Sequence, residues 1–321
     1  MPVVGSMRHA WLDGYQAVSP RERRSAPAVI VAIDEESLNR FGQWPWPRDL
    51  VARLFDRIAA ARPAAIGVDI LFPEPDRLSP EWLAPSVADA DPKLGERLAR
   101  LPRHDSVLAA SIRAAPVVLG IAGLEAGSVS NGPVTPSLRK GPGTLAGIRQ
   151  YATVLRSLPE IDGAAKGHGL LSADTEAGVV RRVPLVAMVG TAPVLPLSLE
   201  TLRVASGQPL FVVRAAVRGV EAVEIGDLSV PTQSDGRLWV HYTPHDPARF
   251  VSAARVLDGQ IDPEELQRKL VLLGVTGLGL IDYQSTPLGE RMPGIEIHAQ
   301  VLENVFDGAL LARPRCPPWA R

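Results

Sequence analysis

The sequence predicts an α/β fold with a mixed, largely parallel central sheet flanked by helices and an antiparallel hairpin extension. Short apolar runs rich in β-branched residues occur at 28–33, 65–72, 117–121 and 270–275, which is typical of strands buried on both faces of a parallel sheet. Helical periodicity separates the first three runs, so these units predict parallel pairing with right-handed crossovers. Part of the second half instead carries turn signals between short apolar segments, which predicts antiparallel pairing.

The first half of the chain contains two predicted helices between these strands. After 28–33 we expect a loop, and Pro47 then occupies the first turn of a helix whose apolar residues recur at helical spacing until Pro63. The second helix covers 105–115, with Asp105 as its N-cap. Residues 127–143 are rich in Gly, Pro and Ser, which predicts a loop or a flexible insertion.

The second half predicts two hairpins. The turn-forming segment AspThrGluAlaGly separates 167–172 from 179–188, and the segment SerAspGly separates 223–230 from 237–242. Antiparallel strands joined by such turns would form the extension of the sheet.

Two further helices are predicted in this half. One covers 198–205 and is ended by Gly207. The other begins at Pro293 and ends before Gly308. Its apolar residues fall on one face, which predicts packing against the sheet. They are Ile295, Ala299, Leu302 and Phe306.

The composition is that of an ordinary globular chain, and it argues against a nucleic-acid partner, an intrachain disulfide and a membrane helix. Of the 321 residues, 46% are hydrophobic and 21% are charged, with a formal net charge of −1. No concentrated basic face is indicated, so nucleic acid is not an expected partner. The densest charge cluster, 21–24, is interpreted as a solvated linker. The single cysteine, Cys316, excludes an intrachain disulfide, and the longest uncharged run, 183–199, contains three prolines that exclude a membrane helix.

Six short motifs carry the strongest signal in the chain. They read VAIDEES (31–37), GQWPWPR (42–48), GVDILFPEPD (67–76), TGLGLID (276–282), TPLG (286–289) and PGIEIHAQ (293–300). In this order and at these spacings, the chain resembles the type-two CHASE domain, an extracellular sensory module of bacterial membrane receptors. The resemblance covers most of the chain.

The resemblance implies one extracytoplasmic sensor domain over 27–312, between membrane-proximal segments at 1–26 and 313–321. In such receptors the domain lies on the periplasmic or extracellular side of the cytoplasmic membrane and is held there by membrane helices, which this chain does not contain. It precedes an adenylate or diguanylate cyclase, a histidine kinase or a serine/threonine kinase. We therefore expect no enzymatic activity in this chain, a small-molecule or protein signal, and a homodimer.

A signal must reach the membrane through the ends of the chain. A sensor works only if its ligand binds two arrangements with different affinity and so shifts their balance. We therefore expect the N-terminal segment around Trp11 to pack close to the last helix, which ends near Gly308.

Carboxylates follow or interrupt three of the predicted strands. Asp34 follows the first strand, Asp69 lies within the second with Glu74 just beyond it, and Asp282 follows the glycine-rich turn after the last. The carboxyl ends of strands form the ligand crevice of open α/β sheets, and carboxylates gathered there repel one another unless a cation compensates. Such an acidic pocket suits a divalent cation such as calcium or magnesium, with Asp34, Asp69 and Asp282 as its candidate ligands, or it suits a cationic ligand. The divalent cation is the one cofactor considered. The alternative for each carboxylate is a cap, a turn or an ion pair with arginine.

Four other residues complete the set of candidate ligand contacts. Trp44 and Trp46 can stack on a ligand or on another subunit, or they can seal the core. Arg48 is a possible partner of the carboxylates. His298, near the start of the last helix, is expected to be neutral because a helix N-terminus disfavours the imidazolium. Its possible roles are a ligand contact, a pH-sensitive switch or packing.

Two other function classes stay open. A metal-dependent hydrolase would need Asp34, Asp69, Glu74 and Asp282 to converge within metal-ligand reach. A structural dimerisation module that senses nothing would lack a pocket of ligand size.

Overall fold

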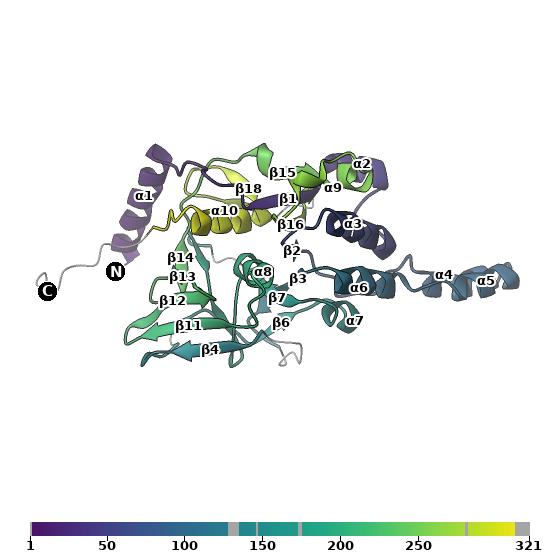
Figure 1. Cartoon of the computed structure of the whole chain (residues 1–321), viewed down its shortest axis with the longest axis horizontal. Coiled ribbons are helices and arrows are strands. Elements are labelled where there is room, and N and C mark those ends of the chain that lie inside the picture. The colour runs from purple at the N-terminus through teal and green to yellow at the C-terminus, as the bar shows by residue number, and fades with distance from the viewer. Residues whose placement is uncertain (1, 128–134, 146, 173–174, 280–281, 312–321) are drawn as a thin grey trace, which may run out of the picture.

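The computed structural model describes residues 2–127, 135–145, 147–172, 175–279 and 282–311, and Figure 1 shows its elements in chain order. Helix α1 (Pro2–Val18) lies at one end of the molecule. Helices α4 (Pro80–Ala88) and α5 (Pro92–Ala99) form an arm at the other end. The central sheet lies between them.

The central sheet has the predicted, largely parallel arrangement. Its order is β15–β1–β16–β2–β3, with β6 and β7 both paired with β3, and only the β3–β6 pair is antiparallel. The strands are β1 (Ala28–Ile33), β2 (Ala65–Asp69), β3 (Val117–Leu124), β6 (Thr153–Leu155), β7 (Gly167–Leu170), β15 (Phe250–Ser252) and β16 (Leu270–Val275).

Alternate residues of these strands enter two separate cores, because successive side chains of a strand point to opposite faces. In β1, Ile30 packs in one core and Val31 in the other, and Leu272 and Val271 divide in the same way in β16. Both faces of the sheet are therefore covered, which explains why the strand sequences are continuously apolar.

Helices cover the two faces unequally. One core contains side chains from five helices. They are α2 (Glu35–Phe41), α3 (Arg48–Ala60), α6 (His104–Ala114), α7 (Pro159–Asp162) and α9 (Ala253–Leu257). The other core contains α8 (Leu197–Ala205), α10 (Gly294–Phe306) and the antiparallel strands. The short 3₁₀ helices η1 (Pro247–Arg249) and η2 (Pro263–Glu265) lie in the connections around β15 and β16.

Helix α8 lies directly on the sheet because glycines face it. A Cβ at Gly67 of β2 would lie 2.4 Å from the Thr201 hydroxyl. A Cβ at Gly169 of β7 would lie 2.4 Å from the Cα of Leu197, at the start of the helix. Any side chain at Gly169 would therefore push the helix backbone off the sheet.

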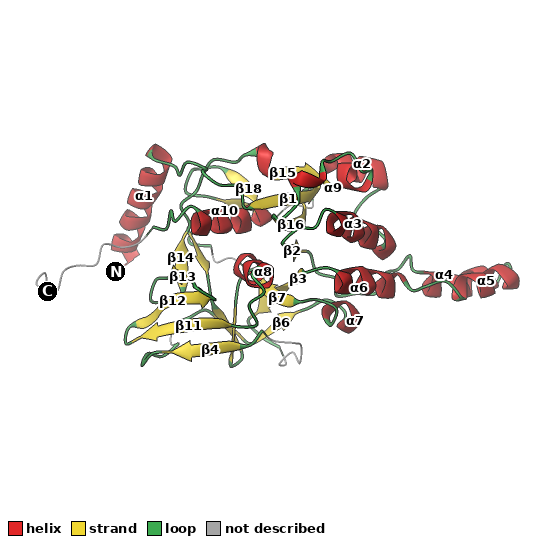
Figure 2. Cartoon of the chain, viewed as in Figure 1, coloured by secondary structure: helices red, strands yellow, loops and turns green. Residues whose placement is uncertain are grey.

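The remaining strands form small sheets, and β4 and β11 to β14 lie together on one side of the molecule, away from α4 and α5 (Figure 2). One has the order β13–β12–β11–β4, and the others are β10–β9–β5, β14–β8 and β17–β18. Their bounds are β4 (Ser137–Lys140), β5 (Gln150–Tyr151), β8 (Arg182–Pro184), β9 (Ala187–Val189), β10 (Ala192–Val194), β11 (Phe211–Ala216), β12 (Gly219–Ile225), β13 (Leu228–Pro231), β14 (Arg237–Trp239), β17 (Tyr283–Ser285) and β18 (Arg291–Pro293). The predicted antiparallel extension is confirmed.

Both predicted hairpins have the wrong partners. β7 pairs in parallel with β3, and β8 pairs with β14. β12 turns back at Gly226 and pairs with β13 instead of with 237–242. Turn chemistry marks where the chain reverses but not which strands then meet. Residue 174 of the first predicted turn lies outside the described residues.

Three local predictions are also corrected. Residues 35–41, predicted as a loop, form α2, because Asp34 caps a short helix there. Asp105 is not an N-cap. It lies buried in the first turn of α6 and accepts a hydrogen bond from the Asp76 amide at 3.2 Å. Within the predicted loop 127–143, residues 137–140 form strand β4, and 128–134 lie outside the described residues.

The N-terminal helix is attached to the body by polar contacts. The Arg181 guanidinium donates to both carboxylate oxygens of Asp13, at 2.8 and 2.6 Å, and the Tyr242 amide donates to Gln16 at 2.9 Å. The segment that follows α1 reaches the end of α10, where Arg21 and Asp307 form an ion pair of 2.6 Å. The contact with the end of α10 is therefore made by Arg21 and not by the region around Trp11 that was expected to pack there, and the Trp11 side chain is 73% exposed.

No described helix combines the length and the apolar character that a membrane crossing requires. The predicted segment 313–321 and Cys316 lie outside the described residues.

Candidate functional site

A cavity of about 670 Å³ opens beyond the carboxyl ends of β2 and β16. Its polar lining residues are Asp69, Ser172, Asp282, Gln284 and His298, and its apolar ones are Trp44, Ile70, Leu71, Leu171, Val183, Val275, Pro293, Gly294, Ile295 and Ile297. The carboxyl end of a parallel sheet is the usual ligand site of an α/β fold, and this volume suits a small organic molecule.

Asp69 is the last residue of β2 and pairs in register with Gly274 of β16. Its side chain is half-buried, and the described residues donate no hydrogen bond to its carboxylate. Burial, together with the nearby charge of Asp282, raises the pKa of Asp69 to about 7. This carboxyl group therefore changes its charge near neutral pH, and none of the described residues provides it with a cationic partner.

Asp282 reaches the same cavity from the connection between β16 and β17. One of its carboxylate oxygens accepts a hydrogen bond from the Gln284 side chain at 2.6 Å. Its backbone carbonyl accepts the Gly294 amide at 2.9 Å, which ties this connection to the start of α10. The sequence correctly predicted that Asp69 and Asp282 would lie near one another.

His298 lines the cavity from α10 and is only 6% exposed. Burial lowers its pKa to about 4, so the imidazole is neutral as predicted, although burial is the main cause and not the helix N-terminus. Its Nδ1 has no hydrogen-bond partner among the described residues. A buried polar atom without a partner is costly unless something else supplies the bond.

The two tryptophans have different environments. Trp46 is 1% exposed, packs in the core and donates its indole N–H to the Gly42 carbonyl at 2.7 Å. Trp44 is partly exposed and lines the cavity, with its ring 6.1 Å from that of Trp46. The core-sealing alternative therefore describes Trp46, and Trp44 stays a candidate ligand contact.

Asp34 does not line the cavity. It is the N-cap of α2, where one oxygen accepts the Ser37 amide at 2.9 Å and the Ser37 hydroxyl at 2.6 Å. The same oxygen accepts the Ser252 hydroxyl at 2.8 Å. Its structural role accounts for all of these contacts.

Arg48 and Glu74 also lie outside the cavity. Arg48 is buried over the Phe72 ring, 4.6 Å from its centroid, and lies 3.8 Å from the Asp105 carboxylate. Burial lowers the pKa of Arg48, against the opposing effect of Asp105 and Asp76. Glu74 is exposed and forms a 3.3 Å ion pair with Arg77.

The predicted divalent-cation set is therefore not assembled. Of Asp34, Asp69 and Asp282, only the last two line one cavity. Throughout the part of the chain that the structure describes, no three His, Cys, Asp or Glu side chains are grouped so that they could hold a metal ion.

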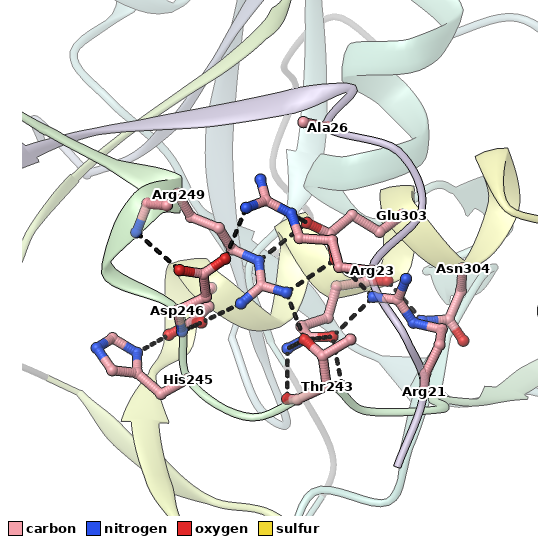
Figure 3. Close-up of polar contacts among 12 residues, drawn as sticks. Arg21, Arg23, Ala26, Thr243, His245, Asp246, Arg249, Glu303 and Asn304 are labelled. Carbon is pink, nitrogen blue, oxygen red and sulfur yellow. Dashed lines mark hydrogen bonds and ion pairs between the residues drawn. The ribbon is translucent and has the colours of Figure 1, made fainter.

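A second polar region, which sequence reasoning missed, lies on another side of α10 (Figure 3). We call it the arginine cluster and define it by Arg21, Arg23, His245, Asp246, Arg249, Glu296, Gln300, Glu303 and Asp307. Arg249 is fully buried and donates to Glu303 at 2.9 Å through two nitrogens, and to Glu296 at 2.9 Å.

Arg21 and Arg23 bring the N-terminal segment into this cluster. Arg21 is 5% exposed and lies 2.5 Å from Glu303, and Arg23 lies 2.8 Å from the same carboxylate. The interpretation of 21–24 as a solvated linker is therefore wrong for these two arginines. A polar stripe on α10, Glu296, Gln300, Glu303 and Asp307, was the available signal, because its spacing places all four on one helix face.

Pairing controls the charge state of this cluster. Burial alone would raise the pKa of Glu303, but the hydrogen bonds and charges of Arg249 and Arg21 hold it below its ordinary value. In the same way, Glu303 and Glu296 overcome burial and raise the pKa of Arg249. Both groups are therefore ionised at neutral pH.

Comparison with known proteins agrees with this architecture. The family profile of the CHASE2 domain matches residues 3–321. Among curated proteins and among solved structures, no significant match to the chain was found. CHASE2 domains are extracellular sensory domains of membrane receptors, which agrees with a ligand-sized cavity at the carboxyl end of the sheet. The match spans essentially the whole chain, and the chain therefore belongs to the CHASE2 domain family.

Proposed function

We propose that this domain is the signal-input unit of a bacterial transmembrane receptor and that its signal is a small molecule bound in the cavity. The observation that carries the proposal is that, among the described residues, Asp69 has no counter-charge and the Nδ1 of His298 has no hydrogen-bond partner, and that both line one cavity. Polar groups left in this state destabilise the empty domain, so a ligand that completes them gains affinity.

The cavity and the N-terminal segment meet on one helix. Gly294, Ile295, Ile297 and His298 of α10 line the cavity, whereas Glu296 and Glu303 of the same helix belong to the arginine cluster. Arg21 and Arg23, which follow α1, are held by that cluster. A ligand that favours one position of α10 would therefore change the contacts that Arg21 and Arg23 of the N-terminal segment make with this helix.

We further propose that the receptor is anchored by membrane helices outside this chain, carries a nucleotide cyclase or protein kinase as its output, and functions as a homodimer. Helix α1 supports the dimer because four of its large apolar residues are exposed at helical spacing. They are Met7, Trp11, Tyr15 and Val18. A second copy of α1 would cover this stripe, as two-fold contacts bury the same surface on both subunits.

The geometry does not favour the hydrolase. Asp34 and Glu74, which that mechanism needs beside Asp69 and Asp282, lie outside the cavity. The non-sensing dimerisation module shares the α1 stripe with the proposed receptor, but it gives no reason for a ligand-sized cavity with unpaired polar groups.

A thermal-shift screen of the purified chain against small metabolites and divalent cations tests the proposal. A ligand that binds only the folded state raises the melting temperature by mass action. We expect a saturable rise that is lost in Leu71→Trp, which fills the cavity, and kept in Leu94→Trp on the exposed face of the arm. A folded, dimeric sample that no compound stabilises would favour the dimerisation module.

A further inference from the structure

The charges around the cavity all have one sign. Asp69 and Asp282 are acidic, and no lysine or arginine is among the described residues that line the cavity. Neither carboxylate has a cationic side chain as a partner there, in contrast to Glu303, which meets three arginines. The cavity therefore attracts positive charge and repels anions.

His298 does not offset this field. Its imidazole is neutral at ordinary pH, so it adds no positive charge to the wall, and one of its nitrogens carries a lone pair that accepts a hydrogen bond. Ser172 and Gln284 add further neutral polar groups. Every polar group in the lining is therefore compatible with a cation that donates hydrogen bonds.

The rest of the lining excludes a bare metal ion as the best occupant. Asp69, Asp282 and His298 are not grouped closely enough to hold a metal within the described part of the chain. The remaining lining residues are apolar or aromatic, and Trp44 presents a ring of the kind that attracts organic cations. A volume of about 670 Å³ also exceeds what one hydrated ion fills.

Resting on the proposed sensor function, we propose that the cavity binds a small organic cation: an ammonium group between Asp69 and Asp282, carried on an apolar body that packs against Trp44, Leu71 and Ile295. The ammonium group supplies the counter-charge that the two carboxylates lack. The apolar body replaces water along the hydrophobic wall.

Binding of such a cation is coupled to proton release. Near neutral pH Asp69 is partly protonated, and a bound ammonium group favours its ionised form. Asp282 and His298 are the other titratable groups of the described lining. His298 is neutral above about pH 5, so it contributes no competing change in that range. Affinity for an amine should therefore rise between about pH 5.5 and pH 8.

Isothermal titration calorimetry with matched probes tests this assignment. The probes are phenethylamine and hexylamine as cations, 2-phenylethanol and 1-hexanol as neutral analogues, 3-phenylpropanoate as an anion, and Ca²⁺ and Mg²⁺ chlorides. At about pH 8 we expect the amines to bind at least about tenfold more tightly than the other probes. Asp69→Asn and Asp282→Asn should each weaken amine binding by at least about tenfold, while Glu74→Gln, an exposed carboxylate outside the cavity, should leave it unchanged.

The alternative outcomes separate this proposal from the sensor function. Tighter binding of a neutral or anionic probe, abolished by Leu71→Trp, would overturn the cation assignment and still support a small-molecule sensor. Binding of a divalent ion that is lost in Asp69→Asn would overturn it in favour of a metal. Failure of both amines to bind the folded protein, or equal affinity in Asp69→Asn with a melting curve like that of the unchanged chain, would also overturn it.

Discussion

The arginine cluster and the cavity, which lie on two sides of α10, differ in whether their carboxylates are paired with cations. In the arginine cluster, Arg21, Arg23 and Arg249 converge on Glu303, and each of these charges has a partner within 3 Å. In the cavity, Asp69 and Asp282 are near one another without any arginine or lysine in the described lining. Burial acts in both places, yet pairing with arginines keeps Glu303 ionised, whereas burial and the nearby charge of Asp282 raise the pKa of Asp69 to about 7.

This difference supports our proposal that the arginine cluster is a fixed joint between α10 and the N-terminal segment and that the cavity binds a ligand. Charges that are already paired give no affinity for an added ion. Removing one of them leaves its partners buried without a counter-charge, which destabilises the folded protein. Charges that are not neutralised lower stability and are relieved by an added ion. Substitutions of carboxylates should therefore have opposite signs in the two regions.

The largest effect is expected for Glu303→Ala, which leaves three arginines without their shared carboxylate. We expect a loss of about 3–5 kcal/mol in the free energy of unfolding, measured by urea denaturation at neutral pH. The exposed Glu96, 3.8 Å from Arg100, is the control, and Glu96→Ala should cost less than about 1 kcal/mol. A comparable small loss for Glu303→Ala would mean that the cluster is not a fixed joint.

The same cluster should make the protein sensitive to acid. Because Arg249 and Arg21 lower the pKa of Glu303, its contribution is complete above its ordinary pKa and is lost as the pH falls through the lowered value. The difference in stability between the unchanged chain and Glu303→Ala should therefore shrink on acidification. A constant difference would contradict the pairing.

In the cavity the expected change in stability has the opposite sign. Asp69→Asn should stabilise the protein at about pH 8 by roughly 2 kcal/mol, which is less than the full pKa shift implies because solvent at the open side of the cavity screens the charge. Between its ordinary pKa and about 7, Asp69 holds a proton in the folded state but not in the unfolded one, so stability falls as the pH rises through this window. The gain from Asn should therefore disappear near pH 4. Thermal melts across this range measure it, and destabilisation at pH 8 would show that Asp69 has a protein partner.

His298 contributes a pH dependence of the opposite direction. Its lowered pKa means that the unfolded chain binds a proton below about 6.5 while the folded protein does not, so stability falls as the pH drops toward 4. We expect His298→Gln to gain about 2 kcal/mol relative to the unchanged chain between pH 8 and pH 5, from about 1.4 kcal/mol for each pH unit below 6.5. Parallel denaturation curves at the two pH values check this, and an unchanged difference would mean that the imidazole is solvated.

The smallest effect is expected at Asp34, which was predicted beside the cavity and lies at the N-cap of α2. Asp34→Ala should cost about 1 kcal/mol of stability, because the capping hydrogen bonds to Ser37 are lost, and Asp34→Asn should cost less because its oxygen still accepts them. Neither change should alter amine binding in calorimetry. A loss of binding in both variants would return Asp34 to the site.

Sequence patterns predicted the parts of the fold that depend on local chemistry. The apolar runs of β1, β2 and β16 and the periodic residues of α3 and α10 are local signals, and each predicted element is present. Asp69 and Asp282 follow neighbouring parallel strands, so their convergence followed from topology.

The failures arise where a residue's surroundings come from distant parts of the chain. β8 pairs with β14, more than fifty residues later, and no turn residue encodes that choice. Arg21 is buried only because Glu303, 282 residues away, receives it. The arm of α4 and α5 was not predicted, since its apolar residues Trp82 and Leu94 remain exposed and give no core-facing stripe.

The close seating of α8 has a mechanical consequence. At Gly169 the helix backbone leaves no clearance, whereas at Gly274 the nearest atom to an added Cβ is the tip of the Ile295 side chain of α10, which can rotate. Of the two helices that share this side of the sheet, α8 is thus seated against it by its backbone, whereas α10 contacts Gly274 through a side chain that can rotate. If a bound molecule displaced α10, the position of α10 relative to α8 would change. A larger residue at Gly169 would shift α8 itself without changing the residues that line the cavity.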